Sequence, residues 1–477
     1  MLLLLALNQR QKPNNMNTDH YDVVIIGAGA SGTALLYTLA RYTDIKRIAI
    51  VEKYDRPGQV NSKASNNSQT LHVGDIETNY TIDKVQQVYP AAMMVAQYAK
   101  SLPETERATI LFPTPKMVLG IGKEQVALLE KRYEALLPIF PTLQKLYRDD
   151  IANIEPEVMR GRRPKEDIIA LYTEEGYAVD FENLSQSLVD QAKIHNPDIE
   201  VFYKSSIQKI QKKNGLYEIS RKNGVTIKSA VVIVDADAYS LLFAKQMGYG
   251  KHFSLIPIAG SFYFTKKLLN GKVYTVQEPK LPFAAVHGDP DVRMPDHTRW
   301  GPTARFHPVL ESANFGTSRD YLRSSGLHRP QTWKSFIKIL LDPIRFIYLI
   351  KNMLYELPWI GNRIFLSNIK KIIPTIKHSD IHIAKGYGGM RLQRVDTTTH
   401  ELQLGEGKIV GDNIIFNMTP SPGASVSLYN ALRDTEQIMK FLGTAFTFDK
   451  QKMETDLVIT QTLASTAEPS IPKGYAS

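Results

Sequence analysis

The chain of 477 residues contains no cysteine. Disulfide bonds, thiolate catalysis, iron–sulfur clusters and attachment of a flavin through sulfur are therefore excluded. A secreted protein held together by disulfides is excluded as well. The sequence also lacks any run of eighteen uncharged apolar residues, so we predict that no helix spans a membrane.

The two ends of the chain carry few features of folded structure. Met1–Leu7 are apolar, but no basic segment precedes them, and the polar stretch that follows has no small-residue cleavage site for a signal peptidase. We predict a disordered extension over residues 1–18, with Met16 as an alternative start, and a flexible tail over residues 446–477.

Composition narrows the class of protein. The length exceeds that at which a single core keeps growing, so two closely joined domains are expected. The net charge of +10 and the pI near 9.3 suit an anionic partner, which is a nucleic acid, an acidic membrane surface or an anionic substrate. The basic residues form no recognised nucleic-acid-binding module, so we expect no nucleic-acid partner.

A glycine-rich turn near the N-terminus is the most informative motif. Residues 23–26 are an apolar run typical of a buried strand, and residues 33–42 continue as an apolar helix. Between them, Gly27 allows a tight turn, Gly29 lets the backbone approach a phosphate, and Gly32 lets helix and strand pack closely. The free amides at the start of the helix would then face a pyrophosphate.

A second strand over residues 47–51 ends in Glu52, twenty residues beyond Gly32. A carboxylate there can accept both hydroxyls of an adenosine ribose and disfavours a 2′-phosphate, which favours FAD or NAD over NADP. The position of the unit near the N-terminus favours FAD, by analogy with FAD-dependent folds.

The remaining segments predict an α/β fold, in which a Rossmann-like FAD-binding domain of the glutathione-reductase type is interleaved with an antiparallel-sheet substrate domain. Residues 207–234 have the pattern of a β-meander followed by a buried strand, residues 262–264, 273–276 and 283–286 are strand-like, and residues 413–417 form a last strand before a helix. We assign residues 19–80, 150–250 and 380–445 to the FAD-binding domain, residues 81–149 to a helical cap, and residues 251–379 to the substrate domain.

Together these segments resemble the malate:quinone oxidoreductase family, within the wider D-amino-acid-oxidase-like superfamily. The resemblance runs from Tyr21 to about Gly443 and includes the motifs at residues 66–72, 77–81, 131–134, 247–250, 260–264, 282–290, 301–304 and 419–424. It implies bound FAD and the oxidation of L-malate to oxaloacetate, with electrons passed to a membrane quinone. Another 2-hydroxy acid, such as L-2-hydroxyglutarate, is the alternative substrate. The resemblance also implies a cytoplasmic protein bound peripherally to the inner face of the cytoplasmic membrane.

Three positions depart from the family pattern. Gln69 stands where many relatives have a small residue, Asp235 and Asp237 replace a usual Asn-Ala-Gly pattern, and the segment around Arg391 keeps its arginine but loses a proline. A carboxylate is therefore expected near the cofactor groove.

Oxidation of a 2-hydroxy dicarboxylate requires a base for the hydroxyl proton and a cation for the carboxylates. Arg391, which follows a glycine-rich turn, is the best candidate for the cation, and Arg305 is second. For the base, His72 and His287 are about equally good candidates, and His72 is also a candidate for orienting the flavin or binding it covalently.

The predicted cofactor site comprises the two nucleotide-binding segments, a loop before His72, one strand residue and a C-terminal turn. Its residues are Gly27, Gly29, Ala30, Ser31, Gly32, Glu52, Lys53, Gln69, Thr70, Ile207, Pro422, Gly423 and Ala424. The amides from Gly423 onward are expected to face the flavin carbonyls at the start of the last long helix.

Residues 333–371 carry a dense set of apolar residues interspersed with Lys334, Lys338, Arg345 and Lys351. Basic residues beside aromatic and aliphatic ones are typical of an interfacial anchor, and a buried hairpin is the alternative. Pro343 should break any helix there. We predict peripheral contact between this region and an anionic membrane surface.

Overall fold

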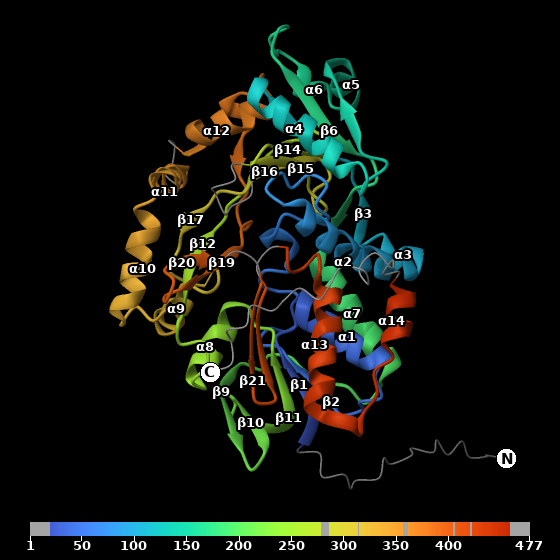
Figure 1. The fold of residues 1–477 in the computed structure, drawn as a ribbon, viewed down its shortest axis with the longest axis vertical. Coiled ribbons are helices and arrows are strands. Elements are labelled where there is room, and N and C mark those ends of the chain that lie inside the picture. The colour runs from blue at the N-terminus through green and yellow to red at the C-terminus, as the bar shows by residue number, and fades with distance from the viewer. Residues whose placement is uncertain are drawn as a thin grey trace, which may run out of the picture.

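The computed structural model describes residues 20–277, 286–312, 314–355, 361–403, 406–419 and 422–457. Two sheet-based halves follow each other along the long axis of the molecule (Figure 1). The half that contains the N-terminal strand lies at the bottom of that view, and the half that contains β14, β15 and β16 lies at the top.

The lower half is built around the glycine-rich motif. Strand β1 (His20–Ile26) lies between β2 (Ile48–Val51) and β11 (Thr226–Val234) and is parallel to both. Strands β8 (Glu200–Phe202) and β22 (Ile414–Met418) extend this parallel sheet, and β21 (Gly407–Gly411) pairs antiparallel with β22. The central strands are buried on both faces, which explains their continuous apolar sequence.

The expected meander is also present. Strands β9 (Ile207–Lys213) and β10 (Leu216–Arg221) pair antiparallel, and β10 pairs with the first half of β11. The last strand of the meander and the buried strand after it, which the sequence suggests as separate elements, form one continuous strand, β11.

Helices cover one face of this sheet. Helices α1 (Ala30–Tyr42), α7 (Phe181–His195) and α13 (Ser427–Leu442) pack side by side, and α2 (Ile82–Ser101) packs on α13. Helix α14 (Lys450–Asp456) also packs on α1, where Asp456 forms an ion pair with Arg41 at 2.8 Å. Residues 446–457 are therefore ordered, contrary to the predicted flexible tail; residues 1–18 and 458–477 lie outside the described residues.

The upper half contains a second, mostly antiparallel sheet. Its strands, in spatial order, are β18 (His382–Ile383), β13 (Tyr263–Lys266), β16 (His297–Gly301), β15 (His287–Pro290), β14 (Lys272–Thr275), β4 (Lys116–Ile121), β6 (Ile168–Thr173) and β5 (Gln144–Leu146). Only the β14–β4 pair among these is parallel. The predicted strand over residues 283–286 falls largely outside the described residues.

The segment 81–149 is not purely helical. It contains α2, α3 (Glu104–Arg107) and α4 (Lys123–Leu136), but also β3 (Leu111–Pro113), β4 and β5. Strand β4 is short, apolar and buried, and a short apolar run does not by itself distinguish a strand from a buried helical turn. Its pairing with β6 and β14, which are distant in sequence, decides the outcome. Helices α5 (Arg148–Ile154) and α6 (Pro156–Met159) and strand β7 (Tyr177–Val179), which pairs with β3, complete this region.

A third layer lies beside the two halves. Strands β17 (Arg305–Phe306), β12 (Phe253–Ala259), β19 (Met390–Asp396) and β20 (Glu401–Gln403) form a small antiparallel sheet. Helices α8 (Ala238–Gln246) and α9 (Ser318–Ser325) pack near it. Helices α10 (Pro330–Leu340), α11 (Pro343–Tyr355) and α12 (Gly361–Ile372) line the left edge of Figure 1. Helix α10 ends at Leu340 and helix α11 begins at Pro343, so the helix break predicted at this proline is confirmed.

Candidate cofactor and substrate site

A cavity of about 860 Å³ lies beyond the carboxyl ends of β1, β2 and β11. This is the position at which open α/β sheets bind their ligands, and the volume is at the upper end of the range for cofactor pockets. Most of the residues predicted from sequence line it, namely Gly27, Gly29, Ala30, Ser31, Glu52, Lys53, Thr70, His72, Ile207, Arg391, Pro422 and Ala424.

The three glycines of the turn have different structural roles. Gly27 has a φ of +108°, and a Cβ there would lie 2.3 Å from the backbone oxygen of Asp235. A Cβ on Gly32 would lie 2.0 Å from the backbone oxygen of Gly27, so these two glycines are required by packing. At Gly29 the nearest atom to a Cβ is the Ser62 hydroxyl, at 3.3 Å. Gly29 therefore leaves space free in front of the N-terminus of α1.

The start of α1 is suited to an anion. Gly29 is the N-cap and supplies no side-chain cap, and the first turn contains no acidic residue. In the part of the chain that the structure describes, only Ala30 N among the first amides has a side-chain partner, the Ser62 hydroxyl at 2.9 Å. Amides at a helix start attract negative charge. These groups fit a pyrophosphate.

Glu52 is fixed at the end of β2. Its Oε2 accepts a hydrogen bond from Ala28 N at 2.8 Å, and its Oε1 accepts one from Tyr54 N at 2.9 Å. Each oxygen keeps a second acceptor site on a side chain that lines the cavity. The carboxylate is thus positioned for the two hydroxyls of a ribose. Lys53 lines the cavity next to it and forms an ion pair with Glu311.

Two further carboxyl groups, Asp235 and Asp237, line the wall of the cavity next to the glycine turn, as the departure at residues 235–237 suggested. Burial and the neighbouring Asp434 raise the pKa of Asp235 to about 7, and burial raises the pKa of Asp237 to about 6. Asn417 Nδ2 donates to Asp235 at 2.8 Å, and Asn61 Nδ2 donates to Asp237 at 2.7 Å. This wall therefore carries less negative charge at neutral pH than two ordinary aspartates would.

The C-terminal turn closes the cavity next to the loop that carries His72. The Ser425 hydroxyl accepts a hydrogen bond from His72 N at 3.1 Å and donates to Thr70 O at 3.3 Å. Gly423 is not on the lining, but a Cβ there would lie 2.6 Å from Thr419 O, so glycine permits the tight turn. Pro422 and Ala424 then lie on the lining just before α13.

His72, which lines this part of the cavity, is paired with a buried carboxylate. His72 Nδ1 lies 2.5 Å from Glu77 Oε1, and Glu77 Oε2 accepts a hydrogen bond from Gly74 N at 2.9 Å. Burial disfavours ionisation of Glu77, but His72 and Lys116 outweigh burial and hold the pKa of Glu77 below its usual value. An ionised glutamate can orient the imidazole and stabilise its protonated form. Glu77 belongs to a motif of the family resemblance, but the sequence did not indicate its role.

Arg391 lies on β19, opposite Ile258 of β12, and its half-buried side chain reaches the cavity. Burial lowers the pKa of Arg391, and the hydroxyls of Tyr348, Tyr274 and Tyr80 are its electrostatic neighbours. A guanidinium remains charged despite such a shift. The three tyrosines come from distant segments, so sequence spacing gave no signal of this grouping.

The two candidate histidines differ in position. His287 is 1% exposed, is not part of the cavity lining, and stacks on Tyr274 with ring centres 4.2 Å apart. Its Nε2 lies 3.6 Å from Asp289 Oδ1. The Tyr274 hydroxyl lies 2.9 Å from Thr70 Oγ1, so His287 forms a layer behind the residues that line the cavity. Arg305, on β17, is not on the lining either.

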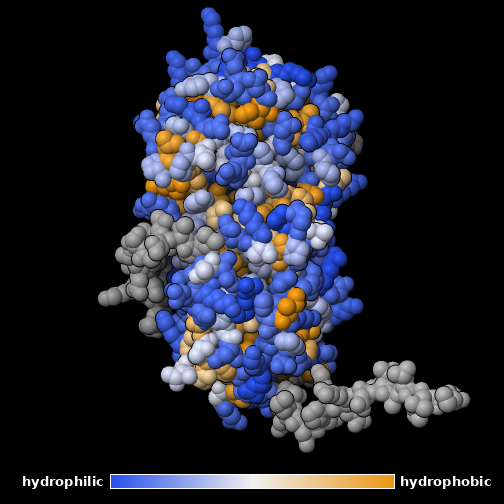
Figure 2. Space-filling view, turned by 90° about the vertical axis from the view of Figure 1, so that its right-hand side faces the viewer, coloured by the Kyte–Doolittle hydropathy of each residue, from blue (hydrophilic) through white to orange (hydrophobic). Residues whose placement is uncertain are grey.

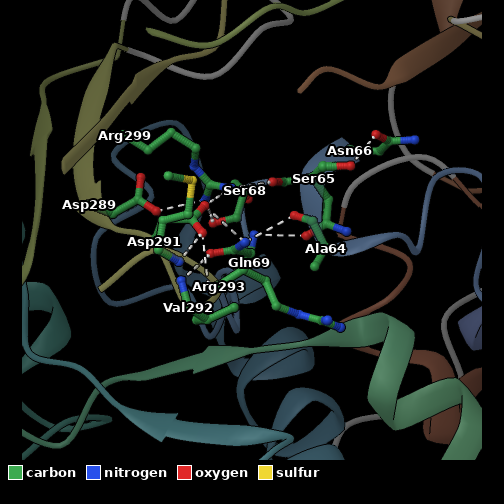
Figure 3. Close-up of polar contacts among 12 residues, drawn as sticks. Ala64, Ser65, Asn66, Ser68, Gln69, Asp289, Asp291, Val292, Arg293 and Arg299 are labelled. Carbon is green, nitrogen blue, oxygen red and sulfur yellow. Dashed lines mark hydrogen bonds and ion pairs between the residues drawn. The ribbon is translucent and has the colours of Figure 1, made fainter. Parts of the chain in front are cut away.

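Gln69 lies in a buried network rather than on the lining (Figure 3). It has a φ of +53°; its Nε2 donates to Ala64 O at 3.0 Å and to Asp291 Oδ2 at 3.2 Å, and its Oε1 accepts from Val292 N at 3.1 Å. These contacts use the amide to join the loop before His72 to the upper half. The predicted flavin contact of the Gln69 side chain finds no support in this position.

Within the described ranges, no group of three or more histidine and carboxylate side chains is arranged to hold a metal ion.

The chain has the fold of FAD-dependent oxidases. L-α-glycerophosphate oxidase from Mycoplasma pneumoniae, solved with FAD bound, superimposes with a TM-score of 0.61 at 18% identity and covers 88% of this chain and 95% of its own. Glycine oxidase from Geobacillus kaustophilus superimposes with a TM-score of 0.60 at 16% identity, over 90% and 97%. At these identities the likeness concerns the fold.

Sequence comparison then gives the family. The family model for malate:quinone oxidoreductase (Mqo) matches residues 19–461. A probable malate:quinone oxidoreductase of Campylobacter jejuni is 42% identical over 450 residues, which is 92% of this chain and all of the relative. The malate:quinone oxidoreductase of Helicobacter pylori strain J99 is 42% identical over 90% of this chain and 96% of the relative. The chain belongs to the malate:quinone oxidoreductase family.

Proposed function

We propose that this chain is an FAD-dependent enzyme that oxidises L-malate to oxaloacetate and passes the electrons to a membrane quinone. The observation that carries the proposal is one cavity that is lined by a dinucleotide cradle at Gly29 and Glu52, by Arg391 and by His72, whose imidazole pairs with the buried Glu77. The names of the 42% identical relatives support the same substrate and acceptor.

The residues around the cradle would hold the cofactor. The amides at the start of α1 would bind the pyrophosphate, Glu52 the ribose, and the turn before α13 the flavin carbonyls. Bound FAD would supply a two-electron acceptor for the hydrogen that leaves the carbinol carbon.

The chemistry assigned to the protein is binding and proton transfer. Arg391 would hold a substrate carboxylate through its planar guanidinium, and the nearby tyrosine hydroxyls can donate to the same group. His72 would accept the hydroxyl proton, and Glu77 would stabilise the imidazolium that results. His287, which does not reach the lining, would support Tyr274.

The test is anaerobic reduction of the bound flavin by a panel of 2-hydroxy acids. L-Malate should bleach the flavin band faster than L-2-hydroxyglutarate does, and the reverse order would favour the alternative substrate. His72→Gln should slow reduction by about 10²–10⁴-fold, whereas His287→Gln should have a much smaller effect. Parental rates in both variants would refute a histidine base.

A second comparison addresses the carboxylate site. Arg391→Ala should lower activity on malate by roughly 10²-fold or more, the equivalent of about 3 kcal/mol, while the FAD content stays near normal. Unchanged kinetics would transfer the role to Arg305 or to another cation.

Contact with a membrane is supported by the outer face of α10 and α11. None of the described helices combines the length and the apolarity that a membrane crossing requires. These two helices and the turn between them nevertheless expose large apolar side chains, including Leu341 at 74% and Ile347 at 66%. Among the described side chains of residues 330–355, the exposed large apolar ones are Trp333, Ile337, Leu340, Leu341, Phe346, Ile347, Ile350, Met353 and Leu354. The opposite face, on the side of α3 and α14, is mostly hydrophilic, with apolar residues in small separate groups (Figure 2).

Several polar groups of helix α11 face the protein interior. Asn352 Oδ1 accepts a hydrogen bond from Ala304 N at 2.8 Å, the Tyr355 backbone oxygen accepts one from the Tyr263 hydroxyl, and Tyr348 neighbours Arg391. An ordinary surface helix has the reverse arrangement. An apolar outer face flanked by exposed Lys334, Lys338 and Lys351 suits the interface of an anionic membrane, which we take to be the inner face of the cytoplasmic membrane. The side chain of Arg345 lies outside the described part.

A further inference from the structure

A second cavity, of about 410 Å³, lies between the start of α4, the loop after α6 and the end of α12. It is lined by four cations, Arg162, Arg163, Lys370 and Lys371, and by one carboxylate, Glu166. The cavity shares no lining residue with the larger one, and nothing in the proposed reaction uses it.

Arg162 builds the floor of this cavity. Its side chain is 3% exposed, and its nitrogens donate to Val158 O, Glu166 Oε2, Lys371 O and Ile372 O at 2.6, 3.1, 2.6 and 3.0 Å. Arg162 therefore caps the end of α12 and neutralises Glu166 at the same time. The acid of the lining is already paired.

The other three cations keep an unbalanced charge. Among the residues that the structure describes, no carboxylate forms an ion pair with Arg163, Lys370 or Lys371. Burial and the positive charge of Lys351 lower the pKa of Lys371. The end of α12 favours nearby cations, but Arg162 already donates to two of its terminal carbonyl oxygens, those of Lys371 and Ile372. Crowded cations around a cavity are stabilised by a bound anion.

The neighbourhood of the cavity indicates the kind of anion. Lys351, the close neighbour of Lys371, lies on α11, whose outer face carries the exposed apolar side chains. Helices α10, α11 and α12 follow one another along one edge of the molecule (Figure 1). A ligand with an anionic head group next to acyl chains would contact both the cationic cavity and the apolar face of α11, whereas a free anion would contact only the cavity.

We propose that this cavity binds the head group of an anionic phospholipid through Arg163, Lys370 and Lys371. The proposal rests on the membrane contact proposed above and adds a defined head-group site to it. The apolar face of α11 supplies binding that does not depend on lipid charge, and the cavity supplies the preference for anionic lipid.

The test compares vesicles of phosphatidylcholine with vesicles that contain one third phosphatidylglycerol, using the full-length holoprotein. The wild type should bind the anionic vesicles at least about tenfold more tightly, and Lys370→Gln/Lys371→Gln should lose most of that gain. Binding to pure phosphatidylcholine should be unchanged. Thermal stability and malate-dependent bleaching of the flavin without vesicles show that the variant is folded and that the proposed reaction is intact.

The matched control is Lys209→Gln/Lys228→Gln. It removes the same two charges from exposed positions on β9 and β11, at the other end of the molecule (Figure 1). This control should keep the preference for anionic vesicles. Equal losses in both double variants would mean diffuse attraction and would overturn the site, as would an unchanged preference in the cavity variant.

The last experiment uses inorganic phosphate as a free anion. If millimolar phosphate stabilises the wild type but not the cavity variant, and both proteins prefer anionic vesicles equally, the cavity serves a free anion and the lipid assignment is wrong. A wild type that binds neither kind of vesicle, while malate still bleaches its flavin, would overturn the membrane contact and the head-group site but not the oxidation.

Discussion

Substitutions at two glycines of the turn distinguish what the protein needs for folding from what it needs for cofactor binding. A Cβ at Gly29 would meet only the Ser62 hydroxyl at 3.3 Å and would otherwise occupy the space in front of α1. We expect Gly29→Val to fold but to lose FAD. Gly32→Ala is the contrasting variant, because its Cβ would lie 2.0 Å from Gly27 O and should destabilise the protein itself. Flavin absorbance and the thermal midpoint of the apoprotein measure the two effects, and a normal flavin content in Gly29→Val would contradict the pyrophosphate assignment.

Asp235 makes the stability of this wall depend on pH. Its pKa of about 7 in the folded state lies above the ordinary value of 3.8, so between these values the folded state holds a proton that the unfolded chain releases. Stability therefore falls as pH rises from about 4 to 7. We expect Asp235→Asn to raise the thermal midpoint by a few degrees at pH 8 and by progressively less as the pH is lowered through 7 toward 4. A difference that does not change with pH would contradict this role.

At the scale of elements, α11 combines an outer apolar face with an inner face that reaches Arg391. Replacing Phe346, Ile347 and Met353 by Gln should weaken binding to phosphatidylcholine vesicles by tenfold or more, because each loses buried apolar area at the interface. The three side chains are exposed, so the fold should persist. Ile194→Gln on α7 is a control with a similar exposure of 67%. Unchanged vesicle binding of the α11 variant would show that this face does not enter the membrane.

Turnover with two acceptors extends the same comparison. The α11 variant should lose activity with a long-chain quinone and keep activity with a soluble dye, since only the quinone must be reached in the bilayer. Equal losses with both acceptors would indicate a folding defect instead.

At the scale of the whole molecule, a buried ionic cluster joins the two halves (Figure 3). Arg299 pairs with Asp289 at 2.7 Å and with Asp291 at 3.2 Å, and it donates to Ser68 O at 2.8 Å and to Asn67 O at 3.1 Å. The cluster therefore ties the loop that leads to His72 onto the second sheet.

We expect Arg299→Met to destabilise the protein by about 3–5 kcal/mol, because it leaves buried carboxylates without their main partner. The midpoint of chemical denaturation measures this change. Arg319→Met, at an exposed position on α9, should be nearly neutral. Similar midpoints for the two variants would show that the cluster does not hold the halves together.

The sequence alone determined the parts of this protein that depend on local chemistry. The turn at residues 27–32 requires glycine, a buried parallel strand requires a continuous apolar run, and Glu52 follows at the spacing of a ribose ligand. These rules act within about thirty residues, so they predicted β1, α1 and β2 correctly, and Gly27, Gly29 and Glu52 lie on the lining of the cavity.

Tertiary structure alone decided what depends on contacts between distant segments. Strand β4 was not predicted because its partners are β6 and β14, and α14 was not predicted because its support is α1. The choice between His72 and His287 for the cavity, the pairing of His72 with Glu77, and the inward position of Gln69 follow from packing across the two halves. Hydrogen bonds and burial of this kind have no periodicity along the chain, and only the folded structure brings their partners together.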